Sequence, residues 1–229
     1  MNNILDELKN YSSPEKALAS QRFFKTGKGQ YGEGDIFLGV KVPECRLIAK
    51  RFKDLPLDSL KGNLSSKFHE ARLVALLILV EKYAKTEQKE IIDFYLNNIS
   101  FVNNWDLVDL SADKLLGRYL FDKDKKILYQ LANSKNIWER RISVVATFHL
   151  IKKRKFEPTF KIVELLMDDE HDLIHKAWGW MLREIGKRNE KYLETFLAMH
   201  YKKMPRTMLR YAIERFDEGR RKKYLNGEI

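Results

Sequence analysis

The sequence predicts an all-α protein built from helices that repeat in pairs along the chain. Gly and Pro together account for only 16 of the 229 residues, and a shortage of helix breakers favours long helices. Apolar residues recur with helical spacing in residues 67–83 and 136–153 and cover most of each helix circumference, as in helices that pack on both sides. Strand-like alternation is nearly absent. We therefore expect ten or more helices and no sheet.

Helix starts are marked by capping residues and by prolines. Ser13 followed by Pro14 is typical of a first turn, because a hydroxyl caps an unpaired N–H group and proline has no N–H to satisfy. Thr86 before the segment EQKE predicts another start, and Pro158 and Pro205 each open a new helical run.

A polar residue before an apolar run recurs along the chain, with spacings of 37, 32, 35 and 34 residues between five aligned positions. Such a period is typical of helix pairs that bury their apolar faces against their neighbours. It predicts an α-solenoid of HEAT-like helical repeats with a concave basic cleft, in a single domain over residues 1–229. The alternative is a non-repeating helical bundle. The aligned positions are Arg72, Asp109, Arg141, Lys176 and Arg210.

Residues 26–35 hold four of the eleven glycines and are predicted to form a loop. The string GKGQYG within it matches the dinucleotide-binding pattern GxGxxG, but that pattern requires a strand before it and a helix directly after it. A helical segment precedes this loop, so we do not expect a nucleotide site. Lys28 and Tyr31 are candidates for contact with DNA, and the alternative is a plain connector between helices.

The net charge points to a polyanionic partner. The 43 Lys and Arg outnumber the 32 Asp and Glu, and residues 202–223 alone hold nine basic and three acidic residues. Clustered bases favour phosphate contacts, because they release the counterions that condense on nucleic acid. General basicity of a housekeeping protein is the alternative.

The single cysteine, Cys45, excludes a disulfide framework and a zinc site with several thiolates. We expect it to be a small buried residue. The longest apolar stretch, Leu73 to Val80, is too short to span a membrane. The first ten residues mix acids and amides, unlike a signal peptide. These features predict a cytoplasmic protein without membrane contact.

In a solenoid, one face of each inner helix lines a common surface, so residues one repeat apart stack along one groove. A carboxylate at Asp109 is unfavourable in a groove that otherwise suits phosphate, and misplaced charge is typical of functional sites. The alternative is an ion pair between Asp109 and Arg141. The predicted groove ridge consists of Asp109, Arg141, Lys176 and Arg210.

Trp105, Trp138 and Trp180 each lie three or four residues from one of the aligned charged positions and share a helix face with it. Indole rings present flat faces to sugars, bases and cations. We expect Trp105 and Trp180 at the groove, and Trp138 and Trp178 in the core.

His171 and His175 are spaced as metal ligands on one helix face, but no third ligand has a fixed spacing. The alternative is a solvated helix start, at which the neighbouring acidic residues interact favourably with the helix dipole. We expect no metal and no cofactor.

Three segments, NNWDLVDLSADKLLG (103–117), NIWERRISVVATFHL (136–150) and KAWGWMLREIGKRN (176–189), have the order and spacing of known motifs. They resemble the bacterial DNA alkylation repair family of AlkD-like alkylpurine DNA glycosylases. The segments RFFKTGKGQYGEGD and FLGVKVPECR are similar to its N-terminal part, and the resemblance extends over roughly residues 10–215. It implies a HEAT-like solenoid that grips duplex DNA, and base excision repair by removal of cationic N3- and N7-alkylated purines.

The resemblance also implies residue roles. The catalytic aspartate of the family falls on Asp109, its two cleft tryptophans on Trp105 and Trp180, and its phosphate-binding arginine on Arg141. Some family members carry a tyrosine in the first long helix, and the corresponding residue in this sequence is Phe23. Phenylalanine lacks the hydroxyl contact but retains the aromatic ring.

We assign Lys176, Arg210, Lys28 and Phe23 to DNA binding beside these residues. The glycine-rich insertion is longer than in the shortest family members, which leaves the range of adducts open. An N3- or N7-alkylpurine already carries positive charge, so it leaves without a general acid, and a carboxylate then stabilises the oxocarbenium-like sugar. The resemblance implies that this occurs without flipping the base into a pocket.

We expect a monofunctional glycosylase, a hydrolase of N-glycosyl bonds, that acts as a monomer on double-stranded DNA carrying alkylated bases. A monomer is expected because the concave face must receive a duplex, and binding would place the protein at the nucleoid. The alternatives are a catalytically weak HEAT-repeat module that binds distorted DNA and a protein-binding helical scaffold.

Overall fold

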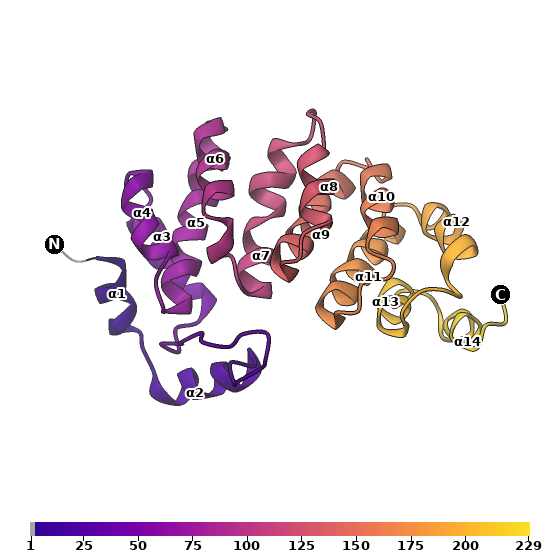
Figure 1. The fold of residues 1–229 in the computed structure, drawn as a ribbon, viewed down its shortest axis with the longest axis horizontal. Helices are drawn as coiled ribbons and strands as arrows, with labels where there is room; N and C mark the ends of the chain where they lie inside the picture. The colour runs from indigo at the N-terminus through magenta and orange to yellow at the C-terminus, as the bar shows by residue number, and fades with distance from the viewer. Residues whose placement is uncertain (1–2) are drawn as a thin grey trace. The chain divides into compact units, whose positions relative to one another are not determined.

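The computed structural model describes residues 3–229 of the chain. Within that range it contains fourteen α-helices, one 3-10 helix and one π-helical segment (Figure 1). The only extended pairing among the described residues is an isolated bridge between Ile36 and Phe68. The prediction of ten or more helices and no sheet is confirmed.

The chain divides into two compact units, the first ending at Ser111 and the second running from Ala112 to Ile229. The helices of unit 1 are α1 (Ile4–Asn10), α2 (Pro14–Phe23), α3 (Val42–Arg51), α4 (Leu57–Leu64), α5 (His69–Thr86), α6 (Lys89–Asn97), η1 (Ile99–Phe101) and α7 (Trp105–Ser111). Unit 2 contains η2 (Asp113–Gly117), α8 (Lys126–Ala132), α9 (Ile137–Lys152), α10 (Glu157–Leu165), α11 (Asp172–Gly186), α12 (Glu190–His200), α13 (Arg206–Ala212) and α14 (Glu218–Asn226). A single domain over the whole chain stays a prediction.

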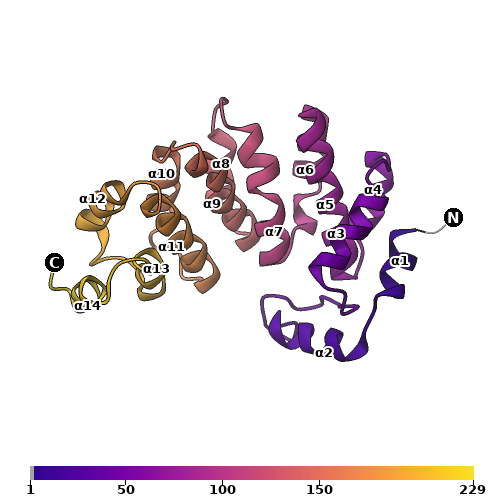
Figure 2. The ribbon, with the colours of Figure 1, turned by 180° about the vertical axis from the view of Figure 1, so that it is seen from behind.

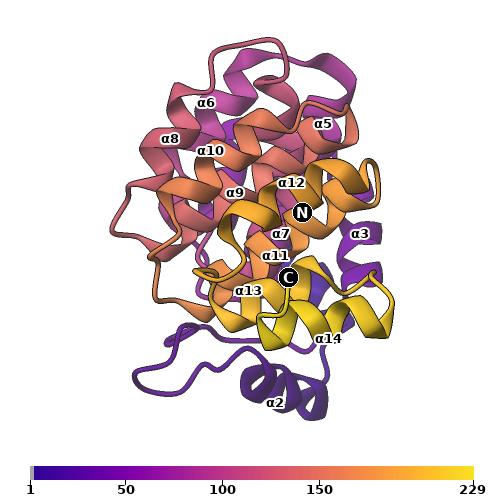
Figure 3. The same cartoon turned by 90° about the vertical axis from the view of Figure 1, so that its right-hand side faces the viewer.

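Helix α5 is the centre of unit 1, where it contacts α1, α3, α4, α6 and α7. Twelve of its 18 residues are buried, because an apolar run that covers most of a helix is stable only when neighbours enclose it. Helix α2 differs, since none of its residues is buried. In Figures 1 and 3, α2 and the loop after it lie beyond the ends of α3 and α5.

Unit 2 consists of helix pairs that contact their sequence neighbours. The second helices of the pairs pack in the order η2, α9, α11 and α13, while α8 and α10 pack against α9 and α12 packs against α11. Figure 2 shows the same succession from behind. Each of the five aligned polar positions is the fourth or fifth residue of α5, α7, α9, α11 or α13. The predicted helical repeats are confirmed as the fold class.

The predicted helix starts are confirmed with one exception. The Ser13 hydroxyl accepts a hydrogen bond from the N–H of Lys16 at the start of α2, Pro158 lies in the first turn of α10 and Pro205 directly precedes α13. The start predicted at Thr86 is wrong, because α5 continues through this residue and α6 begins at Lys89. Thr86 is the last residue of α5, and Gln88 is the residue that precedes the first turn of α6.

The loop predicted at residues 26–35 is confirmed, and it is preceded by α2 and followed by the next helix only at Val42. The loop therefore lacks both the preceding strand and the directly following helix that a dinucleotide-binding turn requires. Gly39, beyond the loop, has φ +80°, and a Cβ atom there would lie 2.5 Å from the backbone nitrogen of Ala17. Only glycine permits this approach of the chain to α2.

The predicted core residues are confirmed: Cys45 and Trp178 are fully buried, and Trp138 is nearly so. Burial raises the pKa of the Cys45 thiol, and the nearby carboxylates of Glu70, Glu44 and Asp106 raise it further. This thiol is therefore a packing group and not a nucleophile at neutral pH. Across residues 3–229, no helix combines the length and the apolar character needed to cross a membrane.

Gly179 of α11 lies in close contact with α13. A Cβ atom on Gly179 would lie 2.5 Å from the carbonyl oxygen of Met208 and closer still to the Cβ of Tyr211. We expect Gly179→Ala to destabilise the protein by about 1–3 kcal/mol through overpacking, measured by urea denaturation. Gly62→Ala in α4 is the matched control, because its Cβ would meet nothing within 4 Å. A Gly179→Ala variant as stable as Gly62→Ala would contradict the close packing.

Candidate functional site

Two of the predicted site residues, Trp105 and Asp109, lie on α7 in unit 1. They are one helical turn apart, so they share a face of the helix. Both are partly exposed. Phe23, at the end of α2, is 66% exposed and lies edge-on to Trp105 with the ring centroids 5.9 Å apart. The structure thus brings Phe23 and Trp105 together.

An aromatic stack supports Trp105 from behind. Phe24 stacks on Trp105 with ring centroids 5.1 Å apart, Phe37 stacks on Phe24 at 4.8 Å, and His69 stacks on Phe37 at 4.4 Å. The three rings that support Trp105 come from three different segments: the end of α2, the loop before α3, and the start of α5. Stacked rings restrict one another's rotamers, so this arrangement holds the Trp105 indole in one orientation.

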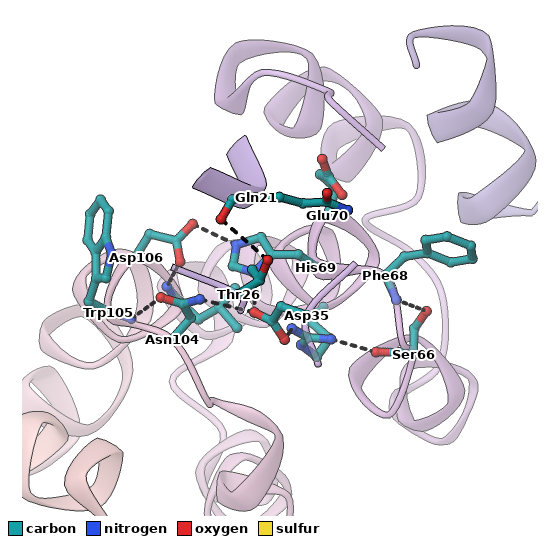
Figure 4. Close-up of polar contacts among 12 residues, drawn as sticks. Gln21, Thr26, Asp35, Ser66, Phe68, His69, Glu70, Asn104, Trp105 and Asp106 are labelled. Atoms are coloured by element: carbon teal, nitrogen blue, oxygen red, sulfur yellow. Dashed lines mark hydrogen bonds and ion pairs between the residues drawn. The ribbon is translucent and has the colours of Figure 1, made fainter. Parts of the chain in front are cut away.

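A buried ionic cluster lies next to this stack, and sequence reasoning missed it. His69 at the start of α5 contacts two carboxylates: its Nδ1 lies 3.1 Å from Asp35 and its Nε2 lies 2.8 Å from Asp106 (Figure 4). All three residues are less than 9% exposed. Asp106 also accepts a hydrogen bond from the N–H of Leu107.

Two further side chains complete the cluster. Arg72 donates to Asp35 over 2.5 Å and to the carbonyl oxygen of Ser66 over 2.7 Å. Asn104 donates to Asp35 over 3.0 Å, and its own oxygen accepts the N–H of Trp105 over 2.8 Å. The cluster therefore joins the loop, α5 and the first turn of α7, and it ends at the backbone of Trp105.

The charges in the cluster shift the pKa of His69 and the pKa of Asp35. Burial alone would lower the pKa of His69, but the Asp106 charge and the hydrogen bonds with Asp106 and Asp35 raise it to about 9. Burial alone would raise the pKa of Asp35, but hydrogen bonds from His69 and Asn104 and the Arg72 charge hold it below the ordinary range. His69 is therefore an imidazolium and Asp35 a carboxylate at neutral pH.

We expect the stability of the protein to fall as the pH rises from about 6.5 to about 9. Unfolded His69 loses its proton near 6.5, whereas folded His69 keeps it to about 9. The protonated His69 stabilises the fold fully below pH 6.5, and this stabilisation is lost as the pH rises through about 9. The total loss in the free energy of unfolding is about 3 kcal/mol. Urea unfolding at pH 6 and pH 9.5 measures this loss. The same loss in His69→Gln, which cannot titrate, would contradict the assignment.

Glu70 fixes the segment that brings Phe37 to the stack. Its carboxylate accepts the backbone N–H groups of Leu38, Gly39 and Val40 over 2.8–3.2 Å. Three amide donors on one carboxylate form a small anion-binding nest that is filled by the chain's own side chain. A cavity of about 350 Å³ adjoins it, lined in part by Phe24, Phe37, His69 and Asp106.

Arg141, on α9 in unit 2, is buried and only 5% exposed. Its guanidinium donates to the carbonyl oxygen of Leu173 in the first turn of α11 over 2.5 Å. This contact links two neighbouring repeats. Binding of a phosphate by Arg141 stays a prediction.

Lys176 and Trp180 lie one turn apart on α11, and both are partly exposed. Lys176 forms an ion pair with Asp172 over 2.7 Å. The Trp180 ring packs on Phe148, with centroids 5.4 Å apart, and the ammonium of Lys152 lies 4.6 Å from the centroid of Phe148. The surroundings of Trp180 are therefore aromatic and cationic.

Arg210 on α13 and Lys28 in the glycine-rich loop are exposed. The structure thus divides the predicted site residues between the units, with Phe23, Lys28, Trp105 and Asp109 in unit 1 and Arg141, Lys176, Trp180 and Arg210 in unit 2. Their convergence on one cleft stays a prediction.

The two histidines at the start of α11 have roles in the fold. His171 caps the helix by accepting the N–H of Leu173 at its Nδ1, and the Nε2 of His175 contacts the carbonyl oxygen of Asp169. In the part of the chain from residue 3 onward, no group of three or more His, Cys, Asp or Glu side chains is placed to hold a metal ion.

Comparisons with solved structures show a shared fold. A predicted DNA alkylation repair enzyme from Enterococcus faecalis is 19% identical, with a TM-score of 0.71 over 90% of this chain and 97% of that one. AlkD2 from Streptococcus mutans is 16% identical, with a TM-score of 0.56 over 89% and 98%. The protein smu.31 from Streptococcus mutans is also 16% identical, with a TM-score of 0.54 over 93% and 98%.

None of the curated proteins matches the chain. A family model described as DNA alkylation repair enzyme matches residues 4–216, which include every predicted site residue. Since this match covers nearly all of the sequence, the chain belongs to the DNA alkylation repair enzyme family.

Proposed function

We propose that this protein is a monofunctional DNA glycosylase that excises cationic N3- and N7-alkylated purines from duplex DNA. The observation that carries the proposal is the placement of Trp105 and Asp109 on one face of α7, partly exposed, in a member of the DNA alkylation repair enzyme family. An aromatic face beside a carboxylate suits a reaction in which positive charge develops on a sugar.

The substrate class follows from the chemistry that these side chains can perform. An alkylated purine cation departs as a neutral base when the N-glycosidic bond breaks, so no protonation of the base is required. Water adds to C1′ of the deoxyribose and releases one proton. What the protein must stabilise is the cationic sugar between these events, and a carboxylate at Asp109 supplies the opposite charge and orients the water.

The aromatic residues have complementary roles in this proposal. Trp105 presents the face of its indole to the developing cation, and Trp180 is the second aromatic residue that we assign to the sugar. Phe23 packs edge-on to Trp105 and is exposed enough to contact the DNA. Its ring supplies surface but no hydrogen bond, so contact through Phe23 is apolar.

Basic side chains bind the phosphates in this proposal. Arg210 and Lys28 are exposed and Lys176 is partly exposed, so these three are assigned to the DNA backbone. Arg141, which is buried beside Leu173, is assigned to a phosphate on the family resemblance. Such contacts position the duplex without reading its sequence. We propose that the protein acts as a monomer at the bacterial nucleoid and needs no cofactor.

Release of the base tests the proposed activity directly. With protein in excess over a duplex that carries N7-methylguanine, we expect free N7-methylguanine to appear in a single turnover, faster than spontaneous depurination, while an unmodified duplex releases no guanine. Chromatography of the released bases measures both. Binding of the methylated duplex without release would overturn the glycosylase and favour a DNA-binding module.

Salt dependence separates DNA binding from protein binding. The affinity for duplex DNA should fall steeply as salt rises, because each phosphate contact releases a counterion. Arg210→Ala should reduce the slope of log K against log salt by about 1. Lys89→Ala, an exposed lysine on α6, is the matched control. Absence of duplex binding at low salt would favour a protein-binding scaffold.

A further inference from the structure

We propose that His69, together with Asp35 and Asp106, is a positioning group that holds the Trp105 indole in its reactive orientation. The inference deepens the proposed function, and its activity measurements rest on that function. It goes beyond the residues assigned to DNA contact, because His69 is buried and its ring nitrogens face Asp35 and Asp106.

Three physical connections run from the His69 cluster to Trp105. His69 contacts Asp106, the residue next to Trp105, over 2.8 Å. Asn104 bridges Asp35 and the N–H of Trp105. The third connection is the stack of His69, Phe37, Phe24 and Trp105. Figure 4 shows the polar connections meeting at the first turn of α7.

The two carboxylates determine the protonation state that this arrangement needs. Each ring nitrogen of His69 faces a carboxylate oxygen, and a carboxylate can only accept a hydrogen bond. An imidazolium donates at both nitrogens, whereas a neutral imidazole donates at one and leaves the other facing an acceptor. Arg72 is the other cation that faces Asp35, and Glu70, Lys16 and Lys41 line the adjoining cavity with His69.

The protonated imidazole therefore joins two segments that are distant in the sequence. Asp35 ends the glycine-rich loop and Asp106 lies in the first turn of α7. Without a donor at both nitrogens, one carboxylate loses its hydrogen bond with His69 in a buried setting, and the contact that His69 makes between loop and helix opens. Phe24 then moves relative to Trp105, and the indole loses its fixed orientation.

The wild-type protein allows a first test without substitution. Nitrogen-15 NMR of labelled histidine should show both His69 nitrogens protonated at pH 7, and the second proton should leave only near pH 9. A neutral imidazole at pH 7 would overturn the inference.

Fluorine NMR of protein labelled with 5-fluorotryptophan reports directly on the indole. The four tryptophans give four resonances, and the Trp105→Phe variant identifies that of Trp105. We expect His69→Gln to shift or broaden the Trp105 resonance and to leave the other three unchanged, because one glutamine amide cannot bridge both carboxylates. An unchanged Trp105 resonance in folded His69→Gln would overturn the inference.

Asp106→Asn is the conservative variant that distinguishes positioning from a general loss of structure. An asparagine there can still accept the N–H of Leu107, and its amide can donate to Nε2 of a neutral His69 that still donates to Asp35. We expect the Trp105 resonance to keep its wild-type chemical shift in Asp106→Asn and to move or broaden in Asp106→Ala. Loss of the resonance position in both variants would overturn the inference.

Activity measurements connect the cluster to the reaction. We expect His69→Gln to slow single-turnover release by about 10- to 100-fold, as a misplaced catalytic group does, with duplex affinity within about twofold of wild type. In wild type, release should decline above pH 9, and this decline should be absent in Asp106→Asn, whose imidazole is already neutral. Leu64→Ala, which removes a buried side chain of α4, controls for lost stability.

The two proposals fail in different ways. If wild type releases no base, the glycosylase proposal fails and the fluorine spectra still decide the positioning role. If wild type releases base and His69→Gln releases it at the same rate, the positioning role fails and the glycosylase stands.

Discussion

Replacement of Asp109 by asparagine is expected to slow release of N7-methylguanine by about 100- to 1,000-fold, the size of effect that follows from losing one preorganised electrostatic group. The amide has the shape of the carboxylate but no charge to place against the cationic sugar. DNA binding should persist, because removal of an acid does not weaken phosphate contacts. Single-turnover release and duplex affinity, measured on the same preparation, separate the two effects.

Asp58→Asn is the matched control for this experiment. Asp58 is an exposed carboxylate in the first turn of α4, so its variant carries the same change in net charge without the change on α7. We expect Asp58→Asn to release the base at the wild-type rate. Equal rates for Asp109→Asn and wild type would remove Asp109 from the reaction, and loss of duplex affinity with an unchanged rate would assign it to DNA binding.

The fold could be predicted from the sequence because the information is periodic. Each repeat must bury the apolar face of a second helix, so apolar runs recur at the repeat length and the residue before the run falls in the first or second turn of α5, α7, α9, α11 and α13. Period alone does not say what a residue on that turn touches. Arg72 and Lys176 occupy equivalent positions, yet Arg72 is buried against Asp35 and Lys176 is partly exposed beside Asp172.

The candidate site could be predicted from the sequence only where its residues are close together in the chain. Trp105 and Asp109 are four residues apart, and helical geometry places them on one face. The cluster behind them joins Asp35, His69 and Asp106, which are 34 and 37 residues apart, and Asp35 lies in a loop outside the aligned helices. A weak signal exists: Asp35 ends a glycine-rich loop and His69 opens a long apolar run, and a charge at such a place needs a buried partner. The identity of that partner depends on tertiary contacts.

The largest loss of stability is expected from Asp35→Asn, about 3–5 kcal/mol, because the substitution leaves the buried Arg72 without its counter-charge and His69 with Asp106 alone. Asp35 accepts from Arg72 at one oxygen and from His69 and Asn104 at the other. An asparagine amide must turn its NH₂ group toward one of these donors, whichever way it is oriented. The melting temperature, followed by circular dichroism, should fall by about 10 °C for this loss.

Asp93→Asn removes a carboxylate of the same size from an exposed pair on α6, where Lys89 lies 2.6 Å away and both side chains are about half exposed or more. Water replaces the lost partner at such a site, so we expect a change below about 1 kcal/mol. The difference between the two variants measures what burial adds to an ion pair. If Asp35→Asn melted within about 2 °C of Asp93→Asn, water would have to reach Asp35, and the buried cluster could not hold the start of α7.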